Sequence, residues 1–161
     1  MNPFRRTRGG YTIIEMVVVL AILGLLAALS MPVVDVVQHR ERERELRRAL
    51  WEIRDALDAW RRASEAGALS KAVGAAPYPP ALLALQQSHP DQRPDRRGET
   101  LRFLRKVPRD PFADPSLPAE LSWGLRGYQS EADAPKAGAE VFDVYSLSSK
   151  VGLNGVPLRE W

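Results

Sequence analysis

The sequence predicts an α+β fold in which one long N-terminal helix carries a small antiparallel sheet on its outer half. Three observations predict it: residues 13–34 are almost wholly apolar, residues 35–66 are amphipathic, and the C-terminal third holds two short segments rich in aromatic and β-branched residues. The 161 residues allow one modest domain beside a membrane segment.

The first element is an apolar N-terminal helix, residues 11–34, that is long enough to cross a membrane. About 22 apolar residues at a rise of about 1.5 Å reach ~33 Å, and a hydrocarbon core is about 30 Å thick. Arg5, Arg6 and Arg8 precede this segment, whereas Asp35 opens a run of mixed sign behind it. Because positively charged flanks stay in the cytoplasm, we expect a single pass with the N-terminus cytoplasmic and the C-terminal domain outside.

Glu15 stands at the start of the apolar segment, where a carboxylate is unfavourable. An ionised acid near the bilayer centre costs about 2.5–3.5 kcal/mol on insertion scales, so such acids usually serve a function with a partner. A cut between Gly10 and Tyr11 would create that partner, because it exposes a cationic amine a few residues away. Glycine beside the cut lets an extended backbone approach a protease closely.

Two other interpretations of the basic start and the apolar segment stay open. A secretory signal peptide cut after Ser30 would release a secreted binding domain, since residues 28–30 offer a small-residue cut site. An uncleaved signal anchor would keep the segment but would leave Glu15 unexplained.

Residues 10–20 read Gly-Tyr-Thr-Ile-Ile-Glu-Met-Val-Val-Val-Leu and resemble the leader motif of type IV prepilins and pseudopilins. The resemblance implies a leader peptide of residues 1–10, a prepilin peptidase that cuts between Gly10 and Tyr11, and N-methylation of Tyr11. It also implies that Glu15 of one copy reaches the Tyr11 amine of its neighbour during assembly. Such a pair would fix the register, because removing one partner leaves the other charge uncompensated.

The amphipathic continuation of the helix, residues 35–66, places apolar residues in steps of four and three. We expect this stripe to hold the sheet, and the alternating charges of residues 40–45 to be solvated. Pro32 joins the two halves and lacks a backbone donor, so it predicts a kink or a loosened turn and, through the resemblance, a point that unwinds in fibres. Helix termination is expected near residues 65–67, where Gly67 can cap. The stripe consists of Leu46, Leu50, Ile53, Leu57 and Trp60.

Residues 67–161 form the predicted outer domain. A short helix is expected from Pro80, an exposed loop over residues 88–98, and a second short helix from Leu101 into a proline-bounded turn. Residues 121–128 and 141–146 are the strand candidates.

The C-terminal end of the chain carries an Asn154-Gly155 pair between apolar residues, which predicts a hairpin turn. Pro157 confines any strand that follows to an edge, because proline cannot donate to a ladder. We expect Trp161 to pack against the base of the long helix.

Residues 101–112 resemble the turn of the major, G-type pseudopilins of type II secretion, in which a leucine-rich turn leads to proline, a basic residue, aspartate and proline. Residues 123–125, residues 141–146 and Trp161 continue this similarity in order. The resemblance implies a pilin-like subunit of a periplasmic pseudopilus that drives protein export from the bacterial inner membrane. Its implied partners are copies of itself, other pseudopilins, prepilin peptidase and an inner-membrane assembly platform. A subunit of a type IV pilus or of a competence or adhesion fibre remains the alternative.

Catalysis and nucleic-acid binding are not expected. The chain has two histidines and no cysteine, and no serine lies in a nucleophile-elbow sequence, so we expect no enzyme. Once the three leader arginines are removed, 20 basic residues face 20 acidic ones, which leaves no basic footprint for a nucleic acid.

Calcium is the one cofactor to consider, because G-type pseudopilins bind it in the loop after the strand that corresponds to residues 141–146. Here the loop over residues 147–155 has no carboxylate, and only Ser148 and Asn154 remain as weak ligand candidates. The best acid cluster, Asp110, Asp114 and Asp143, is explained equally well by turn caps. We therefore expect no metal and no cofactor.

Overall fold

The computed structural model describes residues 10–70, 74 and 76–161, and of residues 28–34 it describes only the backbone. The chain divides into two compact units, Met1–His39 and Arg40–Trp161. One helix, α1 (Ile13–Glu65), contributes to both units. Of the predicted leader only Gly10 is described, and the side chains of Ser30 and Pro32 lie outside the described part, so the predictions for them stay predictions.

Helix α1 begins and ends where local sequence signals place it. The Thr12 hydroxyl caps its start, since it accepts the Glu15 N–H at 3.3 Å. At the other end Gly67 has a φ of 69°, and the Ala68 N–H reaches back to the Ala63 carbonyl at 2.9 Å. This is the bond of a Schellman cap, so the predicted termination by Gly67 is confirmed.

The apolar stripe on the second half of α1 is the centre of the core. Leu46 and Ile53 are completely buried, and Trp60 is 9% exposed. Against this stripe pack side chains from both sheets and the connections, so the predicted core face is confirmed. They include Leu82, Leu85, Leu104, Val107, Trp123, Val141, Val144 and Leu158.

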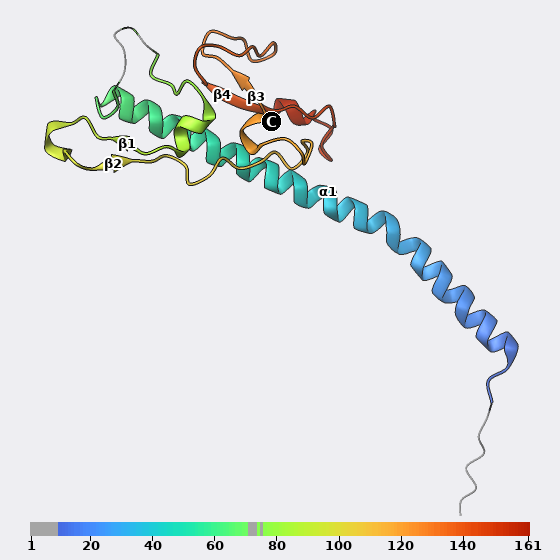
Figure 1. Ribbon diagram of the computed structural model, residues 1–161. Coiled ribbons are helices and arrows are strands. Elements are labelled where there is room, and N and C mark those ends of the chain that lie inside the picture. The colour runs from blue at the N-terminus through green and yellow to red at the C-terminus, as the bar shows by residue number, and fades with distance from the viewer. Residues whose placement is uncertain (1–9, 71–73, 75) are drawn as a thin grey trace, which may run out of the picture. The chain divides into compact units, whose positions relative to one another are not determined.

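The described strands form two separate two-stranded antiparallel sheets (Figure 1). Strand β3 (Trp123–Arg126) pairs with β4 (Asp143–Ser146), and these strands lie inside the segments predicted for them. Strand β1 (His89–Pro90) pairs with β2 (Thr100–Leu101). The long helix with small antiparallel sheets is consistent with the predicted α+β, pilin-like architecture.

The predictions for the middle of the chain hold only in part. Residues 88–98 are mostly exposed, as predicted, but they contain strand β1 and the short 3-10 helix η2 (Pro94–Arg96). The helix predicted from Leu101 does not form, because the N–H groups of Phe103 and Leu104 both donate to the distant carbonyl of Leu85, at 3.2 and 2.8 Å. The helix predicted from Pro80 is present as the 3-10 helix η1 (Leu82–Gln86).

The chain ends in the predicted turn followed by a single bridge. Gly155 has a φ of 80°, and the Gly152 N–H donates to the Val156 carbonyl at 2.9 Å. Instead of a final strand, Val151 and Pro157 form one isolated bridge. The 3-10 helices η3 (Ala119–Leu121) and η4 (Leu158–Glu160) complete the described elements.

Candidate functional site

The predicted cleavage position lies in non-helical backbone directly before α1. Tyr11 is 79% exposed, and apart from Gly10 and its two chain neighbours no atom of the described chain lies within 4 Å of the position that a Cβ on Gly10 would take. The bond between Gly10 and Tyr11 is therefore open to an approaching peptidase.

Glu15 lies in the first turn of α1, exposed to solvent. The positive end of the helix dipole favours a carboxylate at this place. Glu15 follows Tyr11 by four positions in the sequence, and Tyr11 lies two residues before α1 begins. The structure thus places Gly10, Tyr11 and Glu15 at one end of α1, whereas Pro32, the other residue predicted for assembly, is described only by its backbone.

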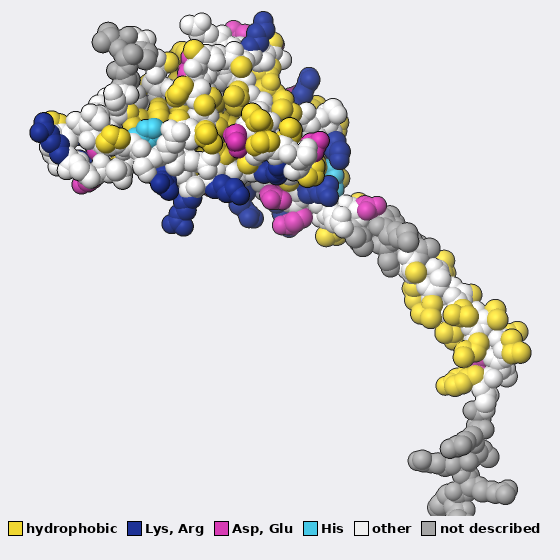
Figure 2. Space-filling model, viewed as in Figure 1, with side chains coloured by type: hydrophobic (Ala, Val, Ile, Leu, Met, Phe, Trp, Pro, Cys, Tyr) yellow, Lys and Arg dark blue, Asp and Glu magenta, His cyan; other side chains and the backbone are white. Residues whose placement is uncertain are grey.

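The described first half of α1 exposes apolar side chains at successive positions around the helix, and Figure 2 shows those on one face. From Ile13 to Leu26 the exposed fractions of the large apolar residues range from 47% to 87%. A helix that is apolar on every side requires a membrane or other helices around it. Among the described residues, none of the helices is long and apolar enough to cross a membrane. The crossing predicted for residues 11–34 stays a prediction.

The three aspartates considered for calcium do not share a site. Asp110 is completely buried and accepts the Phe112 N–H at 2.7 Å and the Ser146 hydroxyl at 2.5 Å. Asp114 accepts the N–H and the hydroxyl of Ser116, both at 2.8 Å, and these bonds lower the pKa of Asp114. Within the described residues no group of three or more metal-binding side chains is found.

Asp143 forms salt bridges with two arginines from different elements. Its two oxygens receive Arg54 Nε of α1 at 2.9 Å and Arg126 Nη2 of β3 at 3.0 Å. Arg54 also donates to the carbonyl of Trp161 at 2.8 Å. This network ties the β3–β4 sheet and Trp161 to the helix, as expected for Trp161. The sequence did not reveal this role of Arg54, because Asp143 is remote in the sequence and meets Arg54 only in the folded chain.

The two weak calcium candidates bond to their own loop. The Ser148 hydroxyl accepts the Lys150 N–H at 3.3 Å, and the Asn154 side-chain oxygen accepts the Val156 N–H at 3.1 Å. Glu43 of α1 holds the same loop, because its Oε1 accepts the Leu153 N–H at 2.5 Å.

Glu43 corrects the prediction that the charged run 40–45 is solvated. It is only 6% exposed. The sequence contained a signal for this, since Glu43 precedes Leu46 by three residues and so continues the buried stripe.

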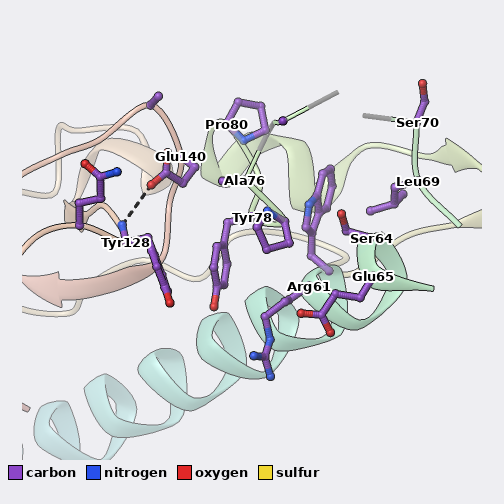
Figure 3. Close-up of a pocket in the computed structure, with 15 residues that line it drawn as sticks. Arg61, Ser64, Glu65, Leu69, Ser70, Ala76, Tyr78, Pro80, Tyr128 and Glu140 are labelled. Carbon is purple, nitrogen blue, oxygen red and sulfur yellow. Dashed lines mark hydrogen bonds between the residues drawn. The ribbon is translucent and has the colours of Figure 1, made fainter. Parts of the chain in front are cut away.

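A pocket of about 800 Å³ lies beside the C-terminal end of α1 (Figure 3). The rings of Tyr78 and Tyr128 line one side, with centroids 5.9 Å apart, and Arg61 and Glu65 of the helix line another. Burial raises the pKa of Tyr78, and the nearby Arg61 guanidinium opposes that rise. None of the described lining residues is a histidine or a cysteine.

The start of α1 therefore defines the class of site: an accessible glycine–tyrosine bond, a capped helix with an acid in its first turn, and an exposed apolar half. Comparison with protein-family models matches residues 5–31 to the prokaryotic N-terminal methylation motif. The chain thus carries a type IV pilin-like prepilin signal, which indicates a prepilin-type, membrane-anchored protein. Comparisons with curated proteins and with solved structures gave no match.

Proposed function

We propose that this chain is a structural subunit of a periplasmic pseudopilus that drives protein export through the type II secretion system. The observation that carries the proposal is the methylation motif over residues 5–31, whose described residues Gly10, Tyr11 and Glu15 lie together at the exposed start of α1.

In the proposed maturation, prepilin peptidase removes residues 1–10 and methylates the new amine of Tyr11. The apolar half of α1 stays attached and anchors the subunit in the inner membrane with its C-terminal domain in the periplasm. An assembly platform then adds the subunit to copies of itself and to other pseudopilins. During this step Glu15 of one copy neutralises the amine of its neighbour, which offsets the burial of both charges.

The resemblance of residues 101–112 to the G-type turn favours a secretion pseudopilus over a pilus. In the structure this turn belongs to the core: Leu104 is 5% and Val107 1% exposed. The indole N–H of Trp123 donates to the carbonyl of Pro108 at 2.8 Å. Two of the segments that carry the resemblance, residues 101–112 and 123–125, are therefore in direct contact.

The N-terminus of the mature protein tests the proposal directly. Expression with a prepilin peptidase, followed by N-terminal sequencing and mass spectrometry, is expected to give a chain that begins at N-methylated Tyr11. A chain that begins at Met31 would support a secreted binding domain, and a chain that retains Arg5, Arg6 and Arg8 would support a signal anchor.

A second experiment separates processing from assembly. Glu15→Ala is expected to leave the cut and the methylation intact but to remove the subunit from fibres, because the neighbouring amine loses its partner. Glu41→Ala, which removes an exposed acid elsewhere on α1, is the matched control and should assemble normally. Normal assembly of Glu15→Ala would contradict the role of Glu15. Loss of the fibres when the secretion platform, but not a pilus platform, is deleted would assign the system.

A further inference from the structure

The second half of α1 presents two charged flanks outside the apolar stripe. We define the basic flank as Arg40 and Arg47 and the acidic flank as Glu45 and Glu52. All four side chains are exposed. The two members of each flank are seven residues apart in sequence, and since a helix has about 3.6 residues per turn, they lie two turns apart on one side. Figure 2 shows Lys or Arg and Asp or Glu side chains along this part of the surface.

The two flanks lie on different sides of the helix. A separation of five residues from Arg40 to Glu45, and again from Arg47 to Glu52, turns through about 500°, which places the flanks about 140° apart. The sector between them contains the exposed Arg44 and Arg48 and also Trp51, a large apolar side chain that is 76% exposed. An exposed tryptophan bordered by charges of opposite sign is typical of an interaction surface.

The charges of these flanks are largely free of bonds inside the chain. Among the described residues, no hydrogen bond or ion pair is found for Arg40, Glu45 or Glu52. The Arg47 guanidinium lies 4.3 Å from the centre of the Trp161 ring, and it has no carboxylate partner in the described part. Four charges are thus available for a partner that carries the complementary pattern at the same spacing.

A second copy of this chain carries that pattern, because the flanks have equal spacing and opposite charge. We propose, on the basis of the function proposed above, that the basic flank of one copy lies against the acidic flank of the next. Arg40 then faces Glu45 and Arg47 faces Glu52 of the neighbour, in parallel helices shifted by five residues, about 7.5 Å. The pairing of Glu15 with the neighbouring Tyr11 amine also requires a shift, and in the same direction, because Glu15 follows Tyr11 in the sequence.

This arrangement specifies an open fibre rather than a closed dimer. Each copy uses one flank toward the copy before it and the other flank toward the copy after it, and such a heterologous contact continues without end. Exposed ion pairs are individually weak, so the flanks select the register and the neighbour, while apolar side chains such as Trp51 supply the cohesion.

Site-specific cross-linking tests the register, because the chain contains no cysteine of its own. Full-length chain carrying both Arg47→Cys and Glu52→Cys is oxidised in bacterial membranes or in sheared fibres. The two positions lie on different sides of one helix and cannot bridge within a copy. The expected product is a ladder of dimers, trimers and longer multimers. The matched control, Arg40→Cys with Glu52→Cys, uses the same flanks at the wrong spacing and should stay monomeric.

Charge reversal provides a second test of the proposed pairing between the flanks. Arg40→Glu or Glu45→Arg alone should lower the yield of multimers about fivefold, since each replaces attraction by repulsion, and the double variant should restore it. Multimers that stop at dimers, a ladder from the control pair, or no recovery in the double variant would overturn the proposal. Cross-linking of the introduced cysteines to a different protein would also overturn the proposal.

The failure of this proposal is distinguishable from the failure of the proposed function. If a general amine cross-linker captures multimers of the unaltered chain but the Arg47/Glu52 cysteine pair does not, the flank register is wrong and the fibre function stands. If the amine cross-linker captures no multimers of the unaltered, correctly processed chain, both proposals are wrong.

Discussion

Asp110 is a buried residue whose hydrogen bonds connect three segments of the chain. Its carboxylate accepts the N–H of Phe112, within the proline-bounded turn, and the hydroxyl of Ser146, at the end of β4. Its own N–H donates to Ser122 Oγ at 3.1 Å. A single side chain therefore joins three segments that share no ladder, which makes it unsuited to act as a metal ligand.

Replacing Asp110 should cost more stability than replacing any exposed aspartate. We expect Asp110→Ala to lower the free energy of unfolding by about 3 kcal/mol, since two buried donors lose a charged acceptor. Asp114→Ala, the exposed control, should cost only about 1 kcal/mol. Urea unfolding of the detergent-solubilised chain, followed by circular dichroism, measures both. Equal losses in the two variants would contradict the role of Asp110.

Asp91 should make part of the stability dependent on pH. The Arg93 side chain bonds to both of its oxygens, with Nη2 at 2.5 Å, and lowers the pKa of Asp91 from 3.8 to about 2. Because the folded pKa lies below the unfolded one, this stabilisation is complete above about pH 4 and is lost as the pH falls toward 2. Asp91→Asn should therefore melt at a lower temperature than the parent at pH 7, and the difference should shrink toward pH 2.

The control for this pH dependence is Asp95→Asn. The Asp95 side chain is 77% exposed and lies 3.9 Å from Arg96, so its loss should leave the melting temperature nearly unchanged at every pH. A difference between Asp91→Asn and the parent that is the same at pH 7 and at pH 2 would show that the carboxylate charge of Asp91 is not the cause.

At the scale of elements, the C-terminal loop of residues 147–157 is held by the helix and by its own backbone. Glu43 accepts the Leu153 N–H, and a Cβ on Gly152 would meet the Trp161 ring at 2.5 Å. This close packing leaves the polar atoms of the loop engaged by protein groups.

Calcium should accordingly leave the stability unchanged. Ser148 and Asn154 already accept backbone N–H groups, and the Lys150 cation lies in the same loop. Thermal unfolding with excess calcium and with chelator should give the same midpoint, whereas a ligand bound only to the folded state would raise it. A clear rise with calcium would refute this expectation. Glu43→Ala should lower the midpoint in both conditions, because the Leu153 N–H loses its acceptor.

The sequence predicted the elements that depend on local signals. The apolar stripe, Gly67 and the Asn154-Gly155 pair each act within a few residues, and the structure contains the helix, its C-terminal end and the turn that they predict. Strands β1 and β2 are two residues each, too short to produce a periodic pattern. The absent helix after Leu101 depended on the remote carbonyl of Leu85, which no local pattern reveals.

At the scale of the whole molecule, the buried core belongs to one of the two compact units. Its buried members run from Leu46 to Leu158, all within the unit Arg40–Trp161. The described apolar residues of the other unit are exposed. The two units therefore differ in how they are stabilised: one by its own core, the other by what surrounds it.

This division predicts that a fragment of residues 40–161 folds by itself. We expect it to be soluble and monomeric and to unfold in one cooperative transition, since it keeps the whole described core. Circular dichroism and analytical ultracentrifugation test this. A fragment of residues 46–161, which lacks Glu43, should remain folded but melt at a lower temperature. Aggregation of the longer fragment, or a gradual transition, would show that the apolar helix is required for folding.

The four tryptophans of the chain give the molecule a built-in optical reporter. Trp60 and Trp123 are 9% and 3% exposed, whereas Trp51 is 76% exposed. Trp51 lies on the side of α1 that is proposed to contact a second copy. Iodide should quench the emission of Trp51 selectively in the isolated subunit. On polymerisation that emission should shift to shorter wavelength and become protected from the quencher, so that growth of the fibre can be followed in real time without any attached dye.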